Sequence, residues 1–147
     1  MINPVALWCR GKYGDRRAWI VLGIRILAAG VWCGFGSVFK VIGAVPRHQE
    51  IVAAVLGPDI APLITVVIGL AETALGLWFL IGFLPRTCAI FQTATIISMN
   101  GLELIYARSL LLAPVPMVVL NAVFLALVWY AALYAPLKNP DVSPHRT

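Results

Sequence analysis

The chain has 147 residues and a net charge of +5; 61% of its residues are hydrophobic and only 12% are charged. A soluble domain carries about 45–50% apolar and about 25% charged residues, so this chain has too few charges to cover a surface that faces water. The composition excludes a soluble enzyme, a disordered segment and a nucleic-acid-binding protein. It predicts a small integral membrane protein whose positive charge is typical of cytoplasmic lysines and arginines.

Four apolar segments are long enough to cross a bilayer, which takes about 20 residues per helix. They cover residues 18–41, 60–84, 87–106 and 115–135. Prolines open the second and fourth segments and separate the second from the third, and a first helical turn tolerates proline. The first segment is too long for the core of a signal peptide, so we expect it to be retained. The sequence predicts an all-α bundle of four transmembrane helices over residues 18–135, with cytoplasmic flanks at 1–17 and 136–147.

Residues 46–56 form one further helix candidate, which is too short and too polar to span the bilayer. Pro46 suits a first helical turn, and Gly57-Pro58 ends the segment. Its apolar residues would share one face, while Arg47 and His48 would lie near water. The pattern predicts a short helix in the membrane interface, and a plain polar connection is the alternative.

The distribution of basic residues predicts the orientation of the spans. Seven lysines and arginines fall in the terminal flanks or between the second and third spans, and three fall on the opposite side. Because these residues are enriched in cytoplasmic loops, we expect both termini in the cytoplasm and a multi-pass protein of a bacterial inner membrane. The seven are Arg10, Lys12, Arg16, Arg17, Arg86, Lys138 and Arg146; the three are Lys40, Arg47 and Arg108.

Ionised residues inside a span cost about 2.5–3.5 kcal/mol each at the helix centre, so they normally face inward and have partners. Arg25 lies in the first span, Glu72 near the centre of the second, and Asn100 and Glu103 in the outer part of the third. Their depths predict a pair of Arg25 with Glu72, and a second pair of Lys40 with Glu103 near the outer face. Such pairs either only neutralise one another and fix the helix register, or belong to a ligand or proton site.

Helical periodicity places the polar residues of each of the first three spans on one face. The fourth span contains only Asn121 and is interpreted as a packing helix. Gly30 and Gly34 have the GxxxG spacing, and with Gly69 and Gly76 they predict that the helices approach closely. The alternative is that these glycines leave room for a flat ligand beside Glu72. The three faces are Arg25, Trp32, Gly36 and Lys40; Thr65, Gly69, Glu72 and Gly76; and Gln92, Thr95, Met99 and Glu103.

Several chemistries lack their residues in this sequence. Cys9, Cys33 and Cys88 include no closely spaced pair for disulfide exchange. His48 and His145 lie outside the spans, so the bundle offers no histidine to a haem. Zinc-ligand spacing, a Ser-His-Asp set and glycine motifs for phosphate or dinucleotides do not occur. We therefore expect no catalytic residue set and no metal site, and a quinone is the one cofactor that stays open.

One motif in each of the first three spans carries a resemblance to a known family. The motifs are Arg25, Val31-Trp32 and Phe39-Lys40; Ile68–Gly76; and Gln92 with Ser98–Glu103. In this order they resemble the DoxX-like family, over about residues 17–135. The resemblance implies a four-helix inner-membrane protein with links to quinone-dependent redox and oxidative-stress complexes. It also implies that Arg25, Lys40, Glu72, Asn100 and Glu103 are the functional positions.

These patterns predict an accessory membrane subunit that binds a lipid-soluble ligand, a quinone or a lipid. Glu72 would accept or position a ligand proton, Arg25 would balance its charge, and Asn100 would supply amide hydrogen bonds. We expect the pocket to open toward the extracytoplasmic half between Lys40, Glu72, Asn100 and Glu103, with residues 46–56 lying over the opening.

Two other functions fit the same sequence. One is the membrane subunit of a quinone-linked oxidoreductase, which would receive electrons from a redox partner protein. The other is a small proton-coupled carrier in which Glu72 titrates; four spans rarely enclose a pathway, so this carrier would act as a homo-oligomer.

Overall fold

The structure is a computed structural model that describes the backbone of residues 4–134 and the side chains of residues 16–134. The predicted tail 136–147, with Lys138 and Arg146, lies outside these residues, as do the side chains of Arg10 and Lys12. Within the described part the chain is helical and contains no strand. Its elements are α1 (Pro4–Cys33), η1 (Gly34–Val41), α2 (Arg47–Leu56), α3 (Ala61–Ile81), α4 (Pro85–Tyr106), η2 (Arg108–Leu110) and α5 (Pro114–Leu133).

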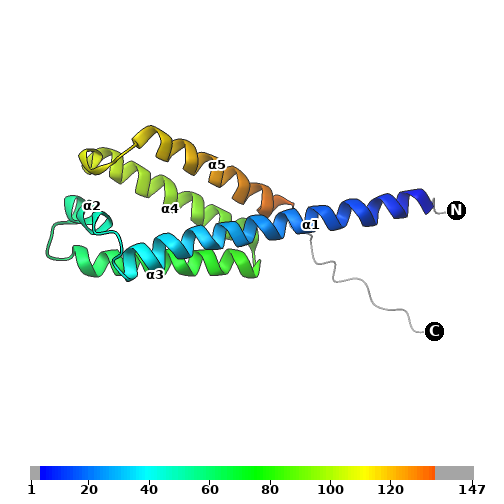
Figure 1. Cartoon of the computed structure of the whole chain (residues 1–147), viewed down its shortest axis with the longest axis horizontal. Coiled ribbons are helices and arrows are strands. Elements are labelled where there is room, and N and C mark those ends of the chain that lie inside the picture. The colour runs from blue at the N-terminus through cyan, green and yellow to red at the C-terminus, as the bar shows by residue number, and fades with distance from the viewer. Residues whose placement is uncertain (1–3, 135–147) are drawn as a thin grey trace.

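Four of the helical stretches are long and apolar enough to cross a membrane, and they confirm the predicted all-α membrane fold. The spans are Arg16–Val41, Ala61–Ile81, Pro85–Tyr106 and Pro114–Leu133. They lie side by side in one bundle, and α1 begins well before its span and projects beyond the other helices (Figure 1). Prolines occupy the first turns of α3, α4 and α5, where the missing N–H group has no intrahelical partner.

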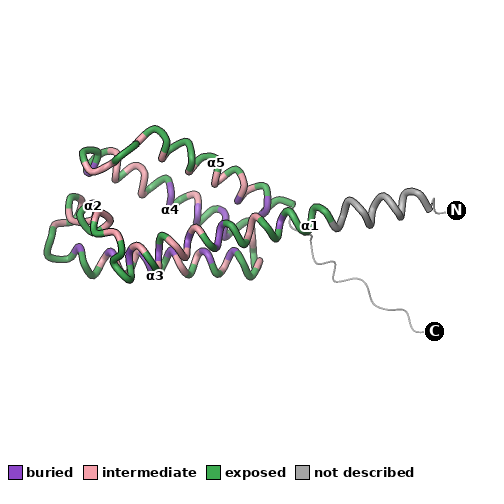
Figure 2. Tube along the Cα trace, in the orientation of Figure 1, coloured by how far each residue is buried: buried purple, intermediate pink, exposed green. Residues whose placement is uncertain are grey.

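The half of the bundle that contains the α3–α4 turn is closed. Buried side chains of α1, α3, α4 and α5 meet there in one hydrophobic cluster, whose residues are among those coloured purple in Figure 2. Five of its eight residues are alanine or cysteine, and such small side chains let helices pack closely in a bilayer. The cluster consists of Val21, Ala28, Phe79, Cys88, Ala89, Val128, Ala131 and Ala132.

The opposite half is open. Toward this end α4 and α5 diverge from α1 and α3, and α2 lies between the diverging ends, where it contacts η1, α3, α4 and η2 (Figure 1). Helix α2 is the short non-spanning helix expected at residues 46–56; it starts after Pro46 and stops at Gly57, whose φ of +93° few other residues adopt.

The end of the first span is a π-helix, η1, whose Gly36 packs against Gly69 of α3. A Cβ atom on Gly69 would lie 2.6 Å from the Gly36 carbonyl oxygen and 2.9 Å from Lys40 Cβ, so only glycine fits there. The close approach expected at Gly30 and Gly34 is wrong, because open space surrounds both. The first span instead meets α3 at Gly36, which follows Gly34 by two residues and Gly30 by six.

Candidate functional site

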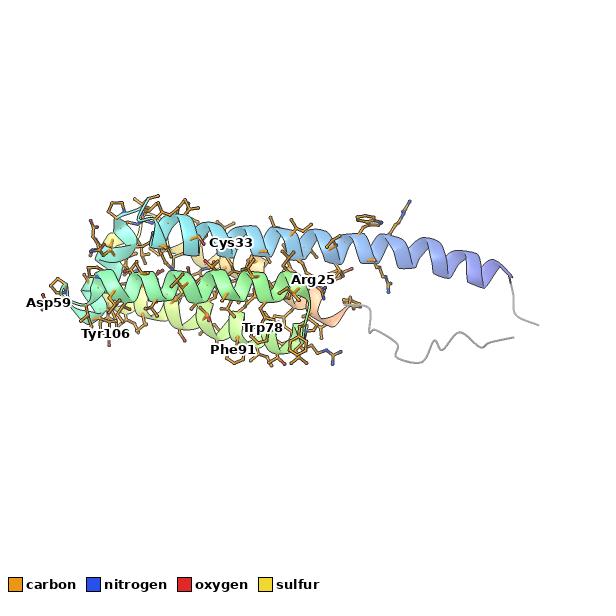
Figure 3. The ribbon with its side chains drawn as sticks, turned by 90° about the horizontal axis from the view of Figure 1, so that it is seen from below. Arg25, Cys33, Asp59, Trp78, Phe91 and Tyr106 are labelled. Atoms are coloured by element: carbon orange, nitrogen blue, oxygen red, sulfur yellow. The ribbon has the colours of Figure 1, made fainter. Side chains whose placement is uncertain are left out.

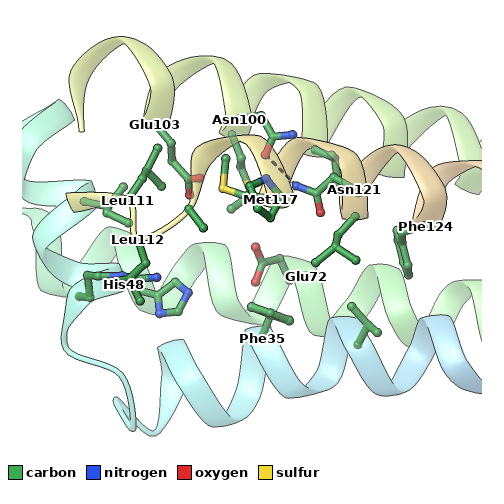
Figure 4. Close-up of a pocket in the computed structure, with 18 of the residues that line it drawn as sticks. Phe35, His48, Glu72, Asn100, Glu103, Leu111, Leu112, Met117, Asn121 and Phe124 are labelled. Atoms are coloured by element: carbon green, nitrogen blue, oxygen red, sulfur yellow. Dashed lines mark hydrogen bonds between the residues drawn. The ribbon is translucent and has the colours of Figure 1, made fainter. Parts of the chain in front are cut away.

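A cavity of about 570 Å³ occupies the open half of the bundle (Figure 4). Ligand pockets in proteins usually have about 300–1,000 Å³. All four spans, α2 and the connection before α5 contribute to its lining. Most of this lining is apolar, with residues such as Val31, Ile96 and Phe124, and a few polar side chains converge on the space.

Three of the five predicted site residues line the cavity, namely Glu72, Asn100 and Glu103. Figure 4 shows Asn100 and Glu103 approaching from α4 and Glu72 from α3. The predicted covering segment also takes part, since α2 supplies Arg47, His48 and Ile51 to the wall. Lys40 and Arg25, the remaining two predicted residues, do not line the space.

Lys40 forms a salt bridge with Glu72. Both residues are buried, with 6% and 2% of their surface exposed. The predicted pairs of Arg25 with Glu72 and of Lys40 with Glu103 are therefore wrong. The Arg25 guanidinium instead fills the space beside Gly82, at the end of α3. Ten helical residues, or about 15 Å, separate Gly82 from Glu72, which is beyond the reach of an arginine side chain.

The register between η1 and α3 explains why Lys40 reaches Glu72. The Gly36–Gly69 contact places Lys40 Cβ against Gly69, one helical turn from Glu72. The lysine stem bridges that turn. A second polar contact fixes the same register, since the Ser37 and Thr73 hydroxyls are 2.9 Å apart. The prediction from depth failed because it placed the end of the first span level with the beginning of the second. In the structure Lys40, at the end of η1, lies beside Glu72, which is three helical turns inside α3.

Glu72 retains one unused hydrogen-bonding atom. Its Oε1 accepts the bond from Lys40, and its Oε2 is buried without a partner among the described residues. A buried acceptor of this kind is costly unless something else pairs with it. Glu72 borders the cavity, so this buried oxygen lies next to the space that a ligand would occupy.

The fourth span contributes more than packing. Asn121 Nδ2 of α5 donates a hydrogen bond of 2.9 Å to Asn100 Oδ1 of α4, and both amides line the cavity (Figure 4). The bond uses one atom of each amide. Asn100 Nδ2 and Asn121 Oδ1 thus offer a donor and an acceptor to a ligand.

Aromatic rings enclose the cavity on the side of α1 and η1. Phe35 and His48 line it, and Phe39 stacks on His48 with ring centroids 6.0 Å apart. Trp32 forms a further part of the wall, and its indole N–H donates a 2.7 Å hydrogen bond to Gln92 of α4. Burial, followed by the positive charge of Lys40, lowers the pKa of His48, which favours the neutral ring.

The family model of the DoxX-like family matches residues 29–129. The chain belongs to the DoxX-like family. The match contains Lys40, Glu72, Asn100 and Glu103, whereas Arg25 precedes it. No curated protein and no solved structure matches the chain significantly. Membership in this family and the four apolar helices together identify a multi-pass membrane protein.

Most of the other lining residues of this DoxX-like protein were not selected from the sequence, and four of them show why. Arg47 and His48 were expected near water, because periodicity cannot give the direction in which a short interfacial helix faces. Asn121 was interpreted as packing, although a lone amide in an apolar helix is itself a signal that a partner exists. Phe35 carries no polar group and offered no signal at all.

No cluster of metal-binding side chains occurs among the described residues of this DoxX-like protein. Cys33 and Cys88 are free thiols, and Cys88 belongs to the closed half. The polar groups of the cavity are carboxylates, amides, a guanidinium and an imidazole. They can exchange hydrogen bonds and protons with a small polar head group in an apolar surrounding.

Proposed function

We propose that this DoxX-like protein is a membrane subunit that binds a quinone in the cavity of its open half. The observation that carries the proposal is Glu72, which is 2% exposed, lines a cavity of about 570 Å³ and has an Oε2 with no hydrogen-bond partner in the described part of the chain. A ligand group that donates a hydrogen bond to this oxygen removes the cost of leaving it unpaired.

The mixture of donors and acceptors supports a quinone. The carbonyl oxygens of an oxidised quinone accept hydrogen bonds, for which Asn100 Nδ2 and the Arg47 guanidinium are donors. The hydroxyl groups of the reduced form donate, for which Glu72 Oε2 and the Glu103 carboxylate are acceptors. A cavity with both kinds of group accommodates both redox forms of the head group.

A lipid with a phosphate head group suits the same cavity less well. Arg47 is the one cationic side chain on the described wall, since Lys40 lies behind Glu72. Two carboxylates, Glu72 and Glu103, face the same space and would repel a phosphate. The charge of the wall therefore favours a neutral head group.

The proposal places both termini in the cytoplasm of a bacterium and the cavity on the extracytoplasmic side of its inner membrane. Arg16, Arg17 and Arg86 lie at the closed end of the bundle, and Arg47 and Arg108 at the open end, which supports this direction. Electrons for the quinone would come from a redox partner protein.

The test is equilibrium binding of a quinone to the purified protein in phosphatidylcholine nanodiscs. The probe is the ubiquinone head group with one isoprene unit, and the signal from empty nanodiscs is subtracted. We expect one binding site per chain. Asn100→Leu removes a cavity amide and should weaken binding about three- to tenfold, the cost of one hydrogen bond.

Thr93→Val is the matched control, because Thr93 is a hydrogen-bonding residue of α4 in the closed half, bonded to Trp129 at 3.0 Å. It should leave the dissociation constant unchanged. Absence of saturable binding to the wild-type protein would overturn the proposal. Equal weakening by both substitutions would locate the effect in helix packing and overturn the assignment of the cavity.

A further inference from the structure

A second cavity of about 370 Å³ lies between α3 and α4, and all of its lining residues belong to these two helices. Glu72 and Met99 line both this cavity and the first one. These two side chains therefore lie between the two spaces. One of them is a methionine, whose unbranched thioether changes rotamer easily.

Small side chains create the second cavity. Ala71 of α3 and Ala94 and Ser98 of α4 are exposed at the surface of the bundle, and they leave a groove between the two helices. The remaining wall is apolar apart from Thr95 and Glu72. Glu72 is buried, and none of the described residues bonds to its Oε2; this oxygen is the independent sign that the groove leads to a ligand and is more than a stripe of small residues.

The depth of the groove matches the hydrocarbon interior. Its residues 68–75 and 94–99 stand near the middle of α3 (Ala61–Ile81) and of α4 (Pro85–Tyr106). A side chain at mid-span lies about 15 Å from either membrane surface. The groove is thus open to acyl chains and closed to lipid head groups.

We propose that the bound quinone extends its isoprenoid tail past Met99 into the groove between α3 and α4. This inference rests on the proposed quinone site and adds the direction of the tail. The head group stays in the first cavity, beside Glu72 and Asn100, and the tail reaches the bilayer at its midplane. The site therefore selects quinones that carry a long apolar tail.

The first cavity has another opening, and its position makes it a poorer exit for a tail. Leu112 and Leu120 line it with 87% and 67% of their surface exposed. Leu112 belongs to the connection before α5, and Arg47 and His48 stand at the same end of the bundle. This opening lies near the membrane surface, where an isoprenoid chain gains less from leaving water than at the midplane.

The test compares a ubiquinone head group without a tail and the same head group with four isoprene units, both in nanodiscs and with concentrations counted per lipid. We expect the wild-type protein to bind the tailed form at least about tenfold more tightly. Ala94→Phe fills the groove from an exposed position. It should reduce that preference to less than about threefold and leave binding of the tailless form unchanged.

The matched control is Ala126→Phe, an exposed alanine of α5 that lines neither cavity. It should keep the full preference for the tailed quinone. A wild-type preference that survives Ala94→Phe, or one that disappears equally in Ala126→Phe, would overturn the tail position and leave the quinone site intact.

A second measurement uses the wild-type protein and is independent of how the variants fold. A quinone whose tail carries a diazirine is irradiated in place, and the attached peptide is identified by mass spectrometry. Labels on residues 68–75 of α3 or 94–99 of α4 support the inference. Labels on α5 contradict it, and failure of either quinone to bind the wild-type protein removes the proposed function itself.

Discussion

The two halves of the bundle differ in what holds their helices together. In the closed half, Phe79, Cys88, Ala89, Val128 and Ala131 have no exposed surface, and their apolar cluster joins α1, α3, α4 and α5. In the open half, contacts between the spans depend on a salt bridge, an amide pair and a glycine contact, and a cavity remains. Tight apolar packing therefore lies at one end of the bundle, and the cavity with its polar contacts lies at the other.

The same difference explains why polar groups are tolerated in one half. The buried cluster of the closed half contains no charged residue, and the Arg25 guanidinium lies beside Gly82 at the end of α3 (Figure 3). In the open half, Lys40 reaches Glu72 because the π-helical turn and Gly36 bring η1 against α3. π-Helical segments often occur at functional sites, where they redirect a side chain at some cost in backbone regularity.

The largest expected effect comes from breaking the Lys40–Glu72 pair. Lys40→Met leaves the Glu72 carboxylate buried without its partner, which should destabilise the protein by about 3–5 kcal/mol. The double variant Lys40→Met with Glu72→Leu removes both charges and should recover most of that loss. Unfolding of the variants in detergent, followed by circular dichroism, measures the difference.

Arg25→Met is the control for this experiment, because Arg25 lies beside Gly82 and away from Glu72. It should cost less than Lys40→Met, and its effect should add to that of Glu72→Leu without coupling. A double variant of Lys40 and Glu72 that is less stable than either single variant would show that the pair contributes net stability to the open half.

A smaller effect is expected from the glycine contact that closes η1 onto α3. Gly69→Ala places a Cβ atom 2.6 Å from the Gly36 carbonyl oxygen, so the helices must separate, and we expect a loss of about 1–3 kcal/mol. Gly30→Ala meets no atom within 4 Å and should be neutral or stabilise α1 by up to about 1 kcal/mol. Apparent melting temperatures of both variants test the contrast; equal destabilisation would contradict it.

These residues also show how far the sequence determines the fold. Hydropathy and proline positions predicted the four spans and the short helix at 46–56, because both follow from the local preference of a segment for lipid or water. Gly36 and Gly69 were on the predicted inward faces. The choice of Gly30 and Gly34 was wrong because a GxxxG spacing identifies a smooth helix surface, but leaves open which surface meets another helix.

The site was predictable in its residue types and unpredictable in its pairings. Glu72, Asn100 and Glu103 were selected because polar groups inside a span need a reason, and all three line the cavity. The partner of Glu72 depends on the axial offset between neighbouring helices. That offset comes from backbone contacts such as Gly36–Gly69, which hydropathy does not encode.

The amide pair of the open half should contribute still less to stability. Side-chain hydrogen bonds between membrane helices average about 0.6 kcal/mol in double-mutant cycles. Asn100→Leu, Asn121→Leu and the double variant should therefore give a coupling energy of about this size. The same variants should lower the free energy of quinone binding by more than they lower the free energy of unfolding. A coupling energy above about 2 kcal/mol would make the pair a structural element of the open half.

The smallest effect concerns the protonation of His48. Burial and the charge of Lys40 hold the pKa of His48 below its ordinary value of about 6.5, so the folded protein binds fewer protons than the unfolded chain at mildly acidic pH. Above pH 6.5 the His48 ring is neutral in both the folded and the unfolded chain, so the fold has its full stability there. As the pH falls below 6.5 toward the lower pKa of the folded state, part of that stability is lost.

The variant His48→Phe isolates this contribution, because a phenyl ring retains the stacking on Phe39 and does not titrate. Between pH 7.5 and 5.5 the apparent melting temperature of the wild-type protein should fall further than that of His48→Phe, by no more than about 2–4 °C. Arg47 and Glu103 share the cavity wall with His48 and are unchanged in both proteins, so their response to pH largely cancels in the difference. A wild-type protein that gains stability relative to His48→Phe on acidification would mean that Glu103 stabilises the imidazolium more than Lys40 opposes it.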